Sequence, residues 1–238
     1  MQTAVDSKPV DKRKVRHDRK REKLLDEAMA LVVEDGMEGL TIARLANRIG
    51  GSVGALYRYF ESKEELVVGL QELAIADFRD FLDARLAAQT RALGACTSPQ
   101  AGALARIMAA VAAYVDHADG SPQPHRLVDL FLSTPDAVLS DAHAQAVGQR
   151  VILPILQIVG GLLAEAVAVG ALAAGDVEQR THLAWAFVHG LDHFRKRDRL
   201  NGAHLQVEVL VPLAVRTLLA GWGASTSALD EAAALVVA

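Results

Sequence analysis

Helical periodicity runs through nearly the whole of this sequence, and it constrains the fold more than any other feature. Apolar residues recur three and four positions apart, whereas no stretch alternates apolar and polar residues over more than a few positions, as a half-buried strand would. Residues 19–34 show the pattern clearly. The apolar stripe here consists of Leu24, Leu25, Ala28, Met29, Leu31 and Val32. The sequence therefore predicts an all-α fold.

Composition places the chain among ordinary globular proteins. It has 238 residues, of which 51% are hydrophobic and 23% charged, enough to bury a core without cross-links. Its single cysteine, Cys96, excludes an intramolecular disulfide and a zinc site made of several cysteines, and it suits a reducing compartment. We expect a cytoplasmic protein, because the start resembles no signal peptide. The most apolar run, 151–175, contains Pro154, Gln157 and Glu165 and predicts a buried helix, not a membrane span.

Positive charge is concentrated near the start of the chain. Residues 8–23 contain nine Lys or Arg against three acidic residues, although the formal charge of the whole chain is −4. Cations gathered in this way favour a polyanionic partner such as double-stranded DNA, because binding releases counterions from the phosphates. We interpret residues 1–18 as a disordered basic arm. A solvated tail, or a membrane-binding arm on a helical adaptor, are the alternatives.

The sequence GGSVG at residues 50–54 matches G-x-S-x-G, the pattern that presents a nucleophilic serine in many hydrolases. That geometry requires a β-strand before the turn. Residues 42–49 instead place apolar side chains three, four and seven positions apart, as in a helix. We therefore expect Ser52 to cap a helix by accepting a hydrogen bond from an amide near Ala55. A serine hydrolase that uses Ser52 is the alternative.

Two short helices joined by glycines predict a helix-turn-helix. Ala46 is small where the two helices would touch, Gly50 permits positive φ in the turn, and Leu56 would fill the core below the second helix. Ser62 and Glu65 then have the spacing of a capping box, which predicts that a further helix begins there.

Residues 20–66 resemble the DNA-binding domain of TetR-family transcriptional repressors. The matching stretches are KLLDEA at 23–28, DG at 35–36, LTIARLA at 40–46 and GALYRYFESKEEL at 54–66. The resemblance implies a three-helix DNA-binding domain over residues 19–66 and a larger helical ligand-binding and dimerisation domain over 67–238. It also implies a repressor with no catalytic residues, cofactor or metal, which binds a near-palindromic operator as a homodimer and responds to a small-molecule effector.

The same resemblance implies roles for individual residues. The second helix of the motif would enter the major groove, with Gly54 where the backbone approaches DNA closely. The side chains near base edges would be Ser52, Val53, Ala55 and Arg58. Those at phosphates would be Thr41, Tyr57, Tyr59 and Lys63. Arg44, and Arg13 and Arg16 of the arm, complete the expected DNA-binding set. For the two tyrosines, the alternative is that their rings pack against the protein while their hydroxyl groups remain in water.

The C-terminal two thirds give less specific signals. Trp185 and His189 resemble a W-x-x-x-H-G motif of one group of such regulators and share a helix face. By analogy, we expect a ligand pocket lined by Tyr114, His117, Leu127, Phe131, Trp185 and His189, with core packing as the alternative. His189 and His193 are four residues apart, a spacing that lets two imidazoles bind one metal ion, and His182 lies seven residues before His189. No carboxylate motif accompanies them, so we predict no metal site. The apolar faces of segments 176–195 and 204–220 suit a dimer interface or an internal core.

Overall fold

The structure is a computed structural model that describes residues 12–94, 98–133, 145 and 148–237. Almost all of these residues are helical and none of them lies in a β-strand, so the all-α prediction is confirmed. Internal contacts divide them into two units. We call residues 12–74 and 126–133 the head, and the remaining described residues the body.

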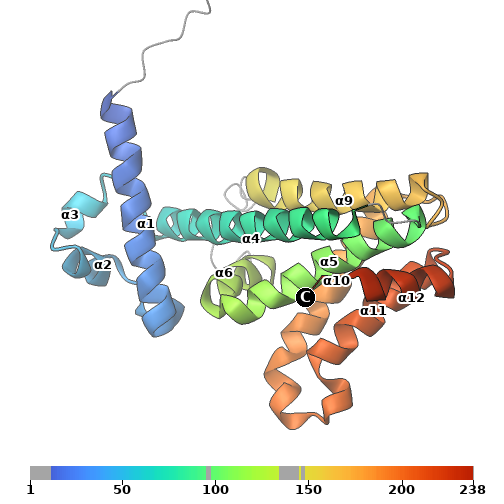
Figure 1. The fold of residues 1–238 in the computed structure, drawn as a ribbon. Helices are drawn as coiled ribbons and strands as arrows, with labels where there is room; N and C mark the ends of the chain where they lie inside the picture. Colours follow the sequence, from blue (N-terminus) through green and yellow to red (C-terminus); the bar gives the residue numbers. More distant parts are fainter. Residues whose placement is uncertain (1–11, 95–97, 134–144, 146–147, 238) are drawn as a thin grey trace, which may run out of the picture. The chain divides into compact units, whose positions relative to one another are not determined.

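Three helices and the start of a fourth build most of the head (Figure 1). They are α1 (Lys12–Gly39), α2 (Ile42–Arg48), α3 (Val53–Leu56) and α4 (Lys63–Leu93). Gly36 interrupts the helical geometry of α1 with φ of 72°. Gly50 has φ of 62° in the turn after α2, a conformation that L side chains rarely adopt, as predicted.

Side-chain caps fix the helix starts of the head, and the capping box predicted at Ser62 and Glu65 is confirmed. The hydroxyl of Thr41 accepts the amide hydrogen of Arg44 at 3.1 Å and caps α2. The Glu65 amide donates to the Ser62 hydroxyl at 3.1 Å, while the Glu65 carboxylate accepts the amide of Glu61 at 2.6 Å. This reciprocal pair of bonds fixes where α4 begins, because it satisfies amides that have no partner within the helix.

The head core is made by side chains one helical turn apart. Leu56 and Phe60 follow each other by four residues and are 1% and 0% exposed, and Ala46 is 2% exposed where α2 meets its neighbours. The first turns of α4 complete this core with Leu66, Val67, Leu70 and Ala74.

The body consists of helices only. Its elements are the later part of α4, α5 (Pro99–Gly120), the start of α6 (Pro122–Ser133), the π-helical turn η1 (Gly148–Ile152), α9 (Leu153–Ala168), α10 (Val177–His193), the 3-10 turns η2 (Phe194–Leu200) and η3 (Ala203–Leu205), α11 (Val207–Gly221) and α12 (Thr226–Leu235). Breaks between these helices fall at Ser98–Pro99, between α5 and α6, after α9 and at Asn201–Gly202.

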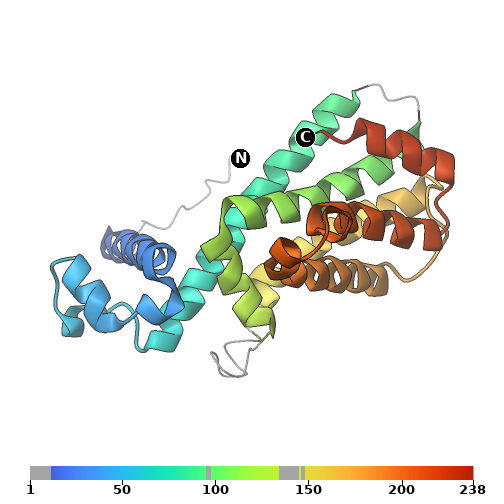
Figure 2. The same ribbon diagram turned by 90° about the horizontal axis from the view of Figure 1, so that it is seen from below.

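Helix α5 is the most buried element of the body. It contacts α9, α11 and α12, and Figure 2 shows α12 alongside it. Small residues such as Ala105, Ala109 and Ala113 are fully buried, which lets neighbouring helices approach closely. The buried Gln89 of α4 holds the end of the chain: its amide donates to the Leu235 carbonyl and its oxygen accepts the Val237 amide, both at 2.8 Å.

Two features of the fold differ from the expected organisation. Residues 12–18 of the arm are helical and begin α1, so the expectation of disorder is wrong for them, while residues 1–11 lie outside the described part. The head also extends past residue 66 to Ala74 and includes residues 126–133. The reason is physical: Leu70, Ala74 and Leu127 are needed to close the head core.

Hydropathy gives no sign of a membrane span. Across the described residues, every helix is either too short or too polar to cross a lipid bilayer.

Candidate nucleic-acid interface

The segment Ser52–Phe60 exposes one set of side chains and buries another. Leu56 and Phe60 anchor it in the head core, whereas Val53 and Tyr57 are 41% and 50% exposed. Ser52, Gly54 and Arg58 are exposed as well, and Ala55 is half-buried. Two large apolar side chains held in solvent beside an arginine form a surface that can meet thymine methyl groups and base acceptors.

The helical part of this segment is short. Only Val53–Leu56 form α3, and a turn follows in which the Tyr59 and Phe60 amides both donate to the Leu56 carbonyl, at 2.8 and 3.0 Å. Gly54 has ordinary helical φ, and a Cβ atom built on it would meet no atom within 4 Å. The backbone at Gly54 is therefore open to a partner that approaches from outside.

Ser52 performs the capping task that the sequence predicts. Its Oγ accepts the Ala55 amide hydrogen at 3.2 Å, and the residues before it form helix α2, not a strand. The nucleophile-elbow interpretation is therefore wrong. Because a hydroxyl also carries one hydrogen, the capping hydroxyls of Ser52 and Thr41 can each still donate to an external acceptor such as a phosphate or base oxygen.

The remaining predicted phosphate contacts surround α3. Lys63 is exposed at the first position of α4, and Thr41 is exposed at the start of α2. Tyr59 is half-buried and its ring stacks on His17 of α1, with ring centroids 4.8 Å apart. Arg13 and Arg16 lie in the first two turns of α1 and are exposed.

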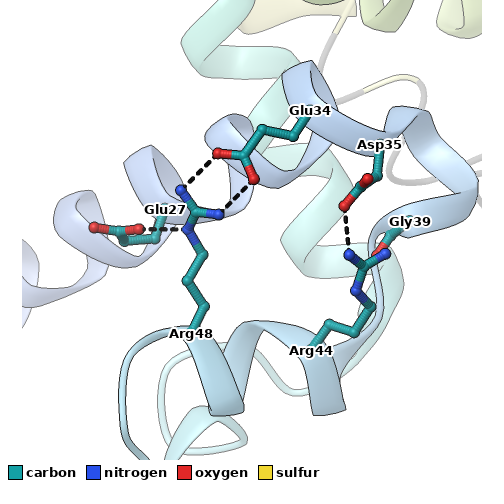
Figure 3. Close-up of polar contacts among 6 residues, drawn as sticks. All are labelled: Glu27, Glu34, Asp35, Gly39, Arg44 and Arg48. Atoms are coloured by element: carbon teal, nitrogen blue, oxygen red, sulfur yellow. Dashed lines mark hydrogen bonds and ion pairs between the residues drawn. The ribbon is translucent and has the colours of Figure 1, made fainter.

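Two arginines of α2 bind carboxylates of α1 (Figure 3). Arg48 donates from Nη1 and Nη2 to the two oxygens of Glu34 at 2.7 and 2.8 Å, and from Nε to Glu27 at 2.8 Å. Arg44, which we expected at DNA, forms an ion pair with Asp35 and donates to the Gly39 carbonyl at 3.2 Å. These contacts hold α2, and through it the turn and α3, against α1.

The contact between Arg48 and Glu34 shifts the pKa of both groups. The hydrogen bond from Arg48 lowers the pKa of Glu34, and the hydrogen bonds to Glu34 and Glu27 raise the pKa of Arg48 further above its usual range. Glu34 and Arg48 therefore both remain charged at neutral pH. Arg48 is thus fully engaged by carboxylates, which distinguishes it from the exposed Arg58.

Sequence comparison identifies the family. A model described as "Bacterial regulatory proteins, tetR family" matches residues 24–70, which contain α2, α3 and most of the head core. The chain belongs to the TetR family. It is accordingly a DNA-binding transcriptional regulator of all-α fold.

Solved structures extend the similarity over most of this TetR-family chain. A protein of unknown function from Rhodococcus sp. RHA1 is 26% identical with a TM-score of 0.61, covering 85% of this chain and 94% of that one. RolR in complex with resorcinol is 16% identical with a TM-score of 0.61, covering 94% and 98%. AibR in complex with isovaleryl coenzyme A and operator DNA is 16% identical with a TM-score of 0.58, covering 84% and 98%. A search of the curated proteins finds no match.

The residues expected to line a ligand pocket separate into different surroundings. In the body, the Tyr114 hydroxyl lies 2.8 Å from His189 Nδ1, and the Trp185 and His189 ring centroids are 6.2 Å apart. His117 is buried and pairs with Asp77 at 3.0 Å. Tyr114, Trp185 and His189 thus lie together, with His117 joined to Tyr114 through the ring of Phe78.

The other two members of that set, Leu127 and Phe131, lie in the part of α6 that belongs to the head. Leu127 is fully buried in the head core, so the structure does not group it with Tyr114, Trp185 and His189 of the body. Sequence spacing could not reveal this, because its partners lie about sixty residues earlier in α4. Phe131 falls in α6, but its side chain is outside the described part of the structure.

The TetR-family body contains an apolar cavity that we did not predict. Its volume is about 350 Å³ and it lies among α5, α11 and α12. The lining residues are Met108, Val111, Ala112, Val211, Pro212, Leu213, Val215, Arg216, Ala233 and Val236. Arg216 forms an ion pair with Asp230 at 2.7 Å. The sequence shows the apolar spacing of α5 and α11. It does not show that a cavity remains between these faces when they pack.

Metal ligands do not cluster in the described residues. Among them, no three His, Cys, Asp or Glu side chains are arranged so that they could hold an ion. His189 and His193 are close, with ring centroids 5.1 Å apart. His182 instead pairs through Nδ1 with the Glu178 carbonyl at 2.9 Å.

Proposed function

We propose that this TetR-family protein is a homodimeric repressor that reads a near-palindromic operator with α3 and releases it when a small molecule binds the body. The observation that carries the proposal is the division of Ser52–Phe60. Leu56 and Phe60 are buried anchors, while Val53, Tyr57 and Arg58 face solvent. A surface that is rigid, basic and partly apolar suits contact with base edges in a major groove.

Phosphate contacts would come from the residues around α3. Thr41, Tyr57, Tyr59 and Lys63 carry hydroxyl or ammonium donors, which bind phosphate oxygens but carry no sequence information. Arg13 and Arg16 extend this set along α1. We assign Arg44 a holding role in place of the direct DNA contact we first expected, because Asp35 and the Gly39 carbonyl already bind its guanidinium group.

Exposed apolar side chains support the dimer. Leu183 and Phe187 on α10 are 57% and 46% exposed, and Val209 and Leu213 on α11 are 49% and 58% exposed. Within each helix the two residues are four positions apart and lie on one face. A twofold interface that buries these stripes would bring two heads to half-sites about 34–36 Å apart, or a multiple of that spacing.

The effector proposal rests on the body and on relatives. RolR binds resorcinol, and AibR binds isovaleryl coenzyme A together with operator DNA. In this chain the body offers two places, the apolar cavity of about 350 Å³ and the Tyr114–Trp185–His189 group. To change operator occupancy from 99:1 to 1:99, an effector must favour the non-binding state by about 5.5 kcal/mol.

Selection of duplexes from a random pool with the purified protein tests the repressor proposal. We expect an enriched near-palindrome whose half-sites are separated by a whole number of helical turns. An enriched site with a single unrepeated half-site would contradict the dimer, and no enrichment would contradict the sequence-reading role.

Sedimentation of variants tests the dimer directly. Leu213→Glu places a charge on the proposed interface and should give monomers with weaker operator binding. Leu200→Glu is the matched control, because Leu200 is 77% exposed and lies in η2, outside the α10 and α11 stripes. A dimer that tolerates Leu213→Glu would place the interface elsewhere.

The effector site can be assigned once a molecule that releases the labelled duplex has been found by screening. Met108→Trp fills the cavity among α5, α11 and α12, and Tyr114→Phe removes the hydroxyl that contacts His189. The variant that loses the response identifies the site. A response that survives both substitutions would exclude both places.

A further inference from the structure

His17 of α1 lies against the end of the DNA-reading segment. Its ring stacks on Tyr59 with centroids 4.8 Å apart and an angle of 24° between the ring planes. Its Nε2 lies 3.5 Å from the carbonyl oxygen of Arg58. One side chain of α1 therefore touches two of the residues that we expect at DNA, one through its ring and one through its main chain.

The two ring nitrogens of His17 both face acceptors. The Arg58 carbonyl can only accept a hydrogen bond, so Nε2 must carry the proton of that contact. Nδ1 lies 3.6 Å from a carboxylate oxygen of Asp18, which attracts a proton on Nδ1 as well. An imidazole with a proton on both nitrogens is the positively charged form. With a proton on both nitrogens, His17 could donate toward both acceptors.

Other charged groups surround this contact. On α1, Arg13 and Arg21 lie one turn to either side of His17, and the ammonium of Lys20 lies 5.8 Å from the Tyr59 centroid. Arg21 lies over the ring of Phe60 and 4.0 Å from Glu65 of α4. The reading segment adds the charge of Arg58. The nearest cations of α2, Arg44 and Arg48, are bound by acidic residues farther along α1.

These surroundings make the charge of His17 depend on DNA. Without DNA, neighbouring cations oppose a further positive charge, and His17 itself is half-exposed to water. A phosphate at the Tyr59 hydroxyl would add negative charge close to the stacked ring and favour the imidazolium. The two binding events are thermodynamically linked. If DNA binding strengthens proton binding, proton binding strengthens DNA binding by the same factor.

We propose that His17 is a positioning residue for Tyr59 and the Arg58 backbone, and that operator binding takes up a proton at His17, so that DNA affinity rises as pH falls. This inference rests on the proposed DNA-reading role of Ser52–Phe60. It adds a residue outside the helix-turn-helix whose charge tunes the strength of that contact.

Fluorescence anisotropy with the selected duplex tests the proposal between about pH 8 and pH 5.5, on either side of the ordinary imidazole pKa, at constant ionic strength. The wild-type affinity should rise severalfold toward low pH, because protons that bind together with DNA also favour DNA binding. His17→Gln should bind with the weaker affinity at every pH. His17→Arg keeps a cation that can stack on Tyr59 and should bind tightly at every pH.

Nuclear magnetic resonance gives a readout that a merely structural role would not change. The ring signal of His17, assigned by its absence in His17→Gln, should titrate at a higher pH in the complex than in the free protein. Thermal unfolding of each variant confirms that the head remains folded. The proposal would be overturned if the ring signal of His17 titrated with the same midpoint pH in the free protein and in the complex.

The outcomes separate the two levels of the account. A wild-type affinity that does not change with pH, or a rise that persists in His17→Gln, overturns the role of His17 and leaves DNA reading intact. A protein that binds neither the selected duplex nor a random duplex at any pH overturns the proposed function, and the inference with it.

Discussion

Arg48 and Glu34 form a two-pronged ion pair, in which two guanidinium nitrogens donate to the two carboxylate oxygens at 2.7 and 2.8 Å. The third nitrogen of Arg48 binds Glu27, two helical turns earlier on α1, at 2.8 Å. Planar contacts of this kind fix orientation as well as distance. The last turn of α2, which leads into the glycine turn and α3, is therefore held in a defined position on α1.

This arrangement predicts that Glu34→Ala weakens DNA binding, which is the opposite of what the loss of a negative charge alone would do. Removal of an acidic residue near DNA should strengthen binding if simple charge decides. We expect severalfold weaker binding to the selected duplex, because the loss of the Glu34 carboxylate loosens α2 and α3. Glu38→Ala removes the same charge from an exposed position at the end of α1 and is the control for simple electrostatics. Tighter binding by Glu34→Ala would show that the pair has no positioning role.

Gly54 allows a test that separates folding from DNA binding. Gly54→Ala should stabilise the free protein by about 0.5–1 kcal/mol, because alanine suits a helix better and its Cβ would meet no atom within 4 Å. The same methyl group should weaken operator binding by about 1–3 kcal/mol, the range for removal of one base-reading interaction. Chemical unfolding and duplex titration measure the two effects.

A matched glycine in the body provides the control. Gly161 lies within α9, and an added Cβ there would also meet nothing within 4 Å. Gly161→Ala should stabilise the protein without changing DNA affinity. If Gly54→Ala also left the affinity unchanged, the backbone of α3 would not approach DNA closely.

The first turns of α1 predict a salt effect. Arg13→Gln and Arg16→Gln should each reduce the slope of log affinity against log salt by about 0.9 for every phosphate that the arginine neutralises in the wild type. Arg199→Gln removes an exposed charge from η2 in the body and should leave the slope unchanged. A slope that is the same in all four proteins would remove α1 from the interface.

Asp192 predicts how stability depends on pH. Burial alone would raise its pKa, but hydrogen bonds with His125 at 2.9 Å and Arg195 at 2.8 Å outweigh that effect, and the pKa lies below its usual value. Because the folded state then binds fewer protons than the unfolded state, the contribution of Asp192 is present above about pH 4 and is lost as pH falls through the lowered pKa.

Asp192→Asn should therefore lower the free energy of unfolding by about 1–3 kcal/mol at neutral pH. In denaturant titrations across pH, the variant should lose less stability than the wild type on acidification. Asp83→Asn disrupts an exposed pair with Arg79, at 3.8 Å, and should change stability little. Equal acid dependence of the Asp192→Asn variant and the wild type would contradict this account.

Local chemistry in the sequence was enough to predict the turn and two of the helix starts in the head. The capping residues Ser52 and Ser62 and the positive φ of Gly50 depend on neighbours within four residues, and all three are confirmed. The all-α fold and the breaks before α5 and after α9 follow from equally local signals. Such features can be predicted from one sequence because tertiary contacts reinforce them but do not select them.

Contacts between distant segments could not be predicted in this way. Arg48 binds Glu27 and Glu34, although the surface carries many other carboxylates. The only indication of this contact in the sequence is that the two residues are seven positions apart and so share one face of α1. Leu127 joins a core whose other members lie far away in the sequence. His17 belongs to no motif in the sequence. Its proposed positioning role follows only from the ring of Tyr59, which stacks on it.

The central claim, that α3 reads base sequence, is tested most directly by the ratio of two affinities. The protein is titrated against the selected duplex and against a scrambled duplex of the same composition at the same salt concentration. The account predicts a ratio of about a thousand or more for the wild type, the usual range for specific DNA recognition, and a markedly smaller ratio for Arg58→Ala. Equal affinities of the wild type for both duplexes would contradict it.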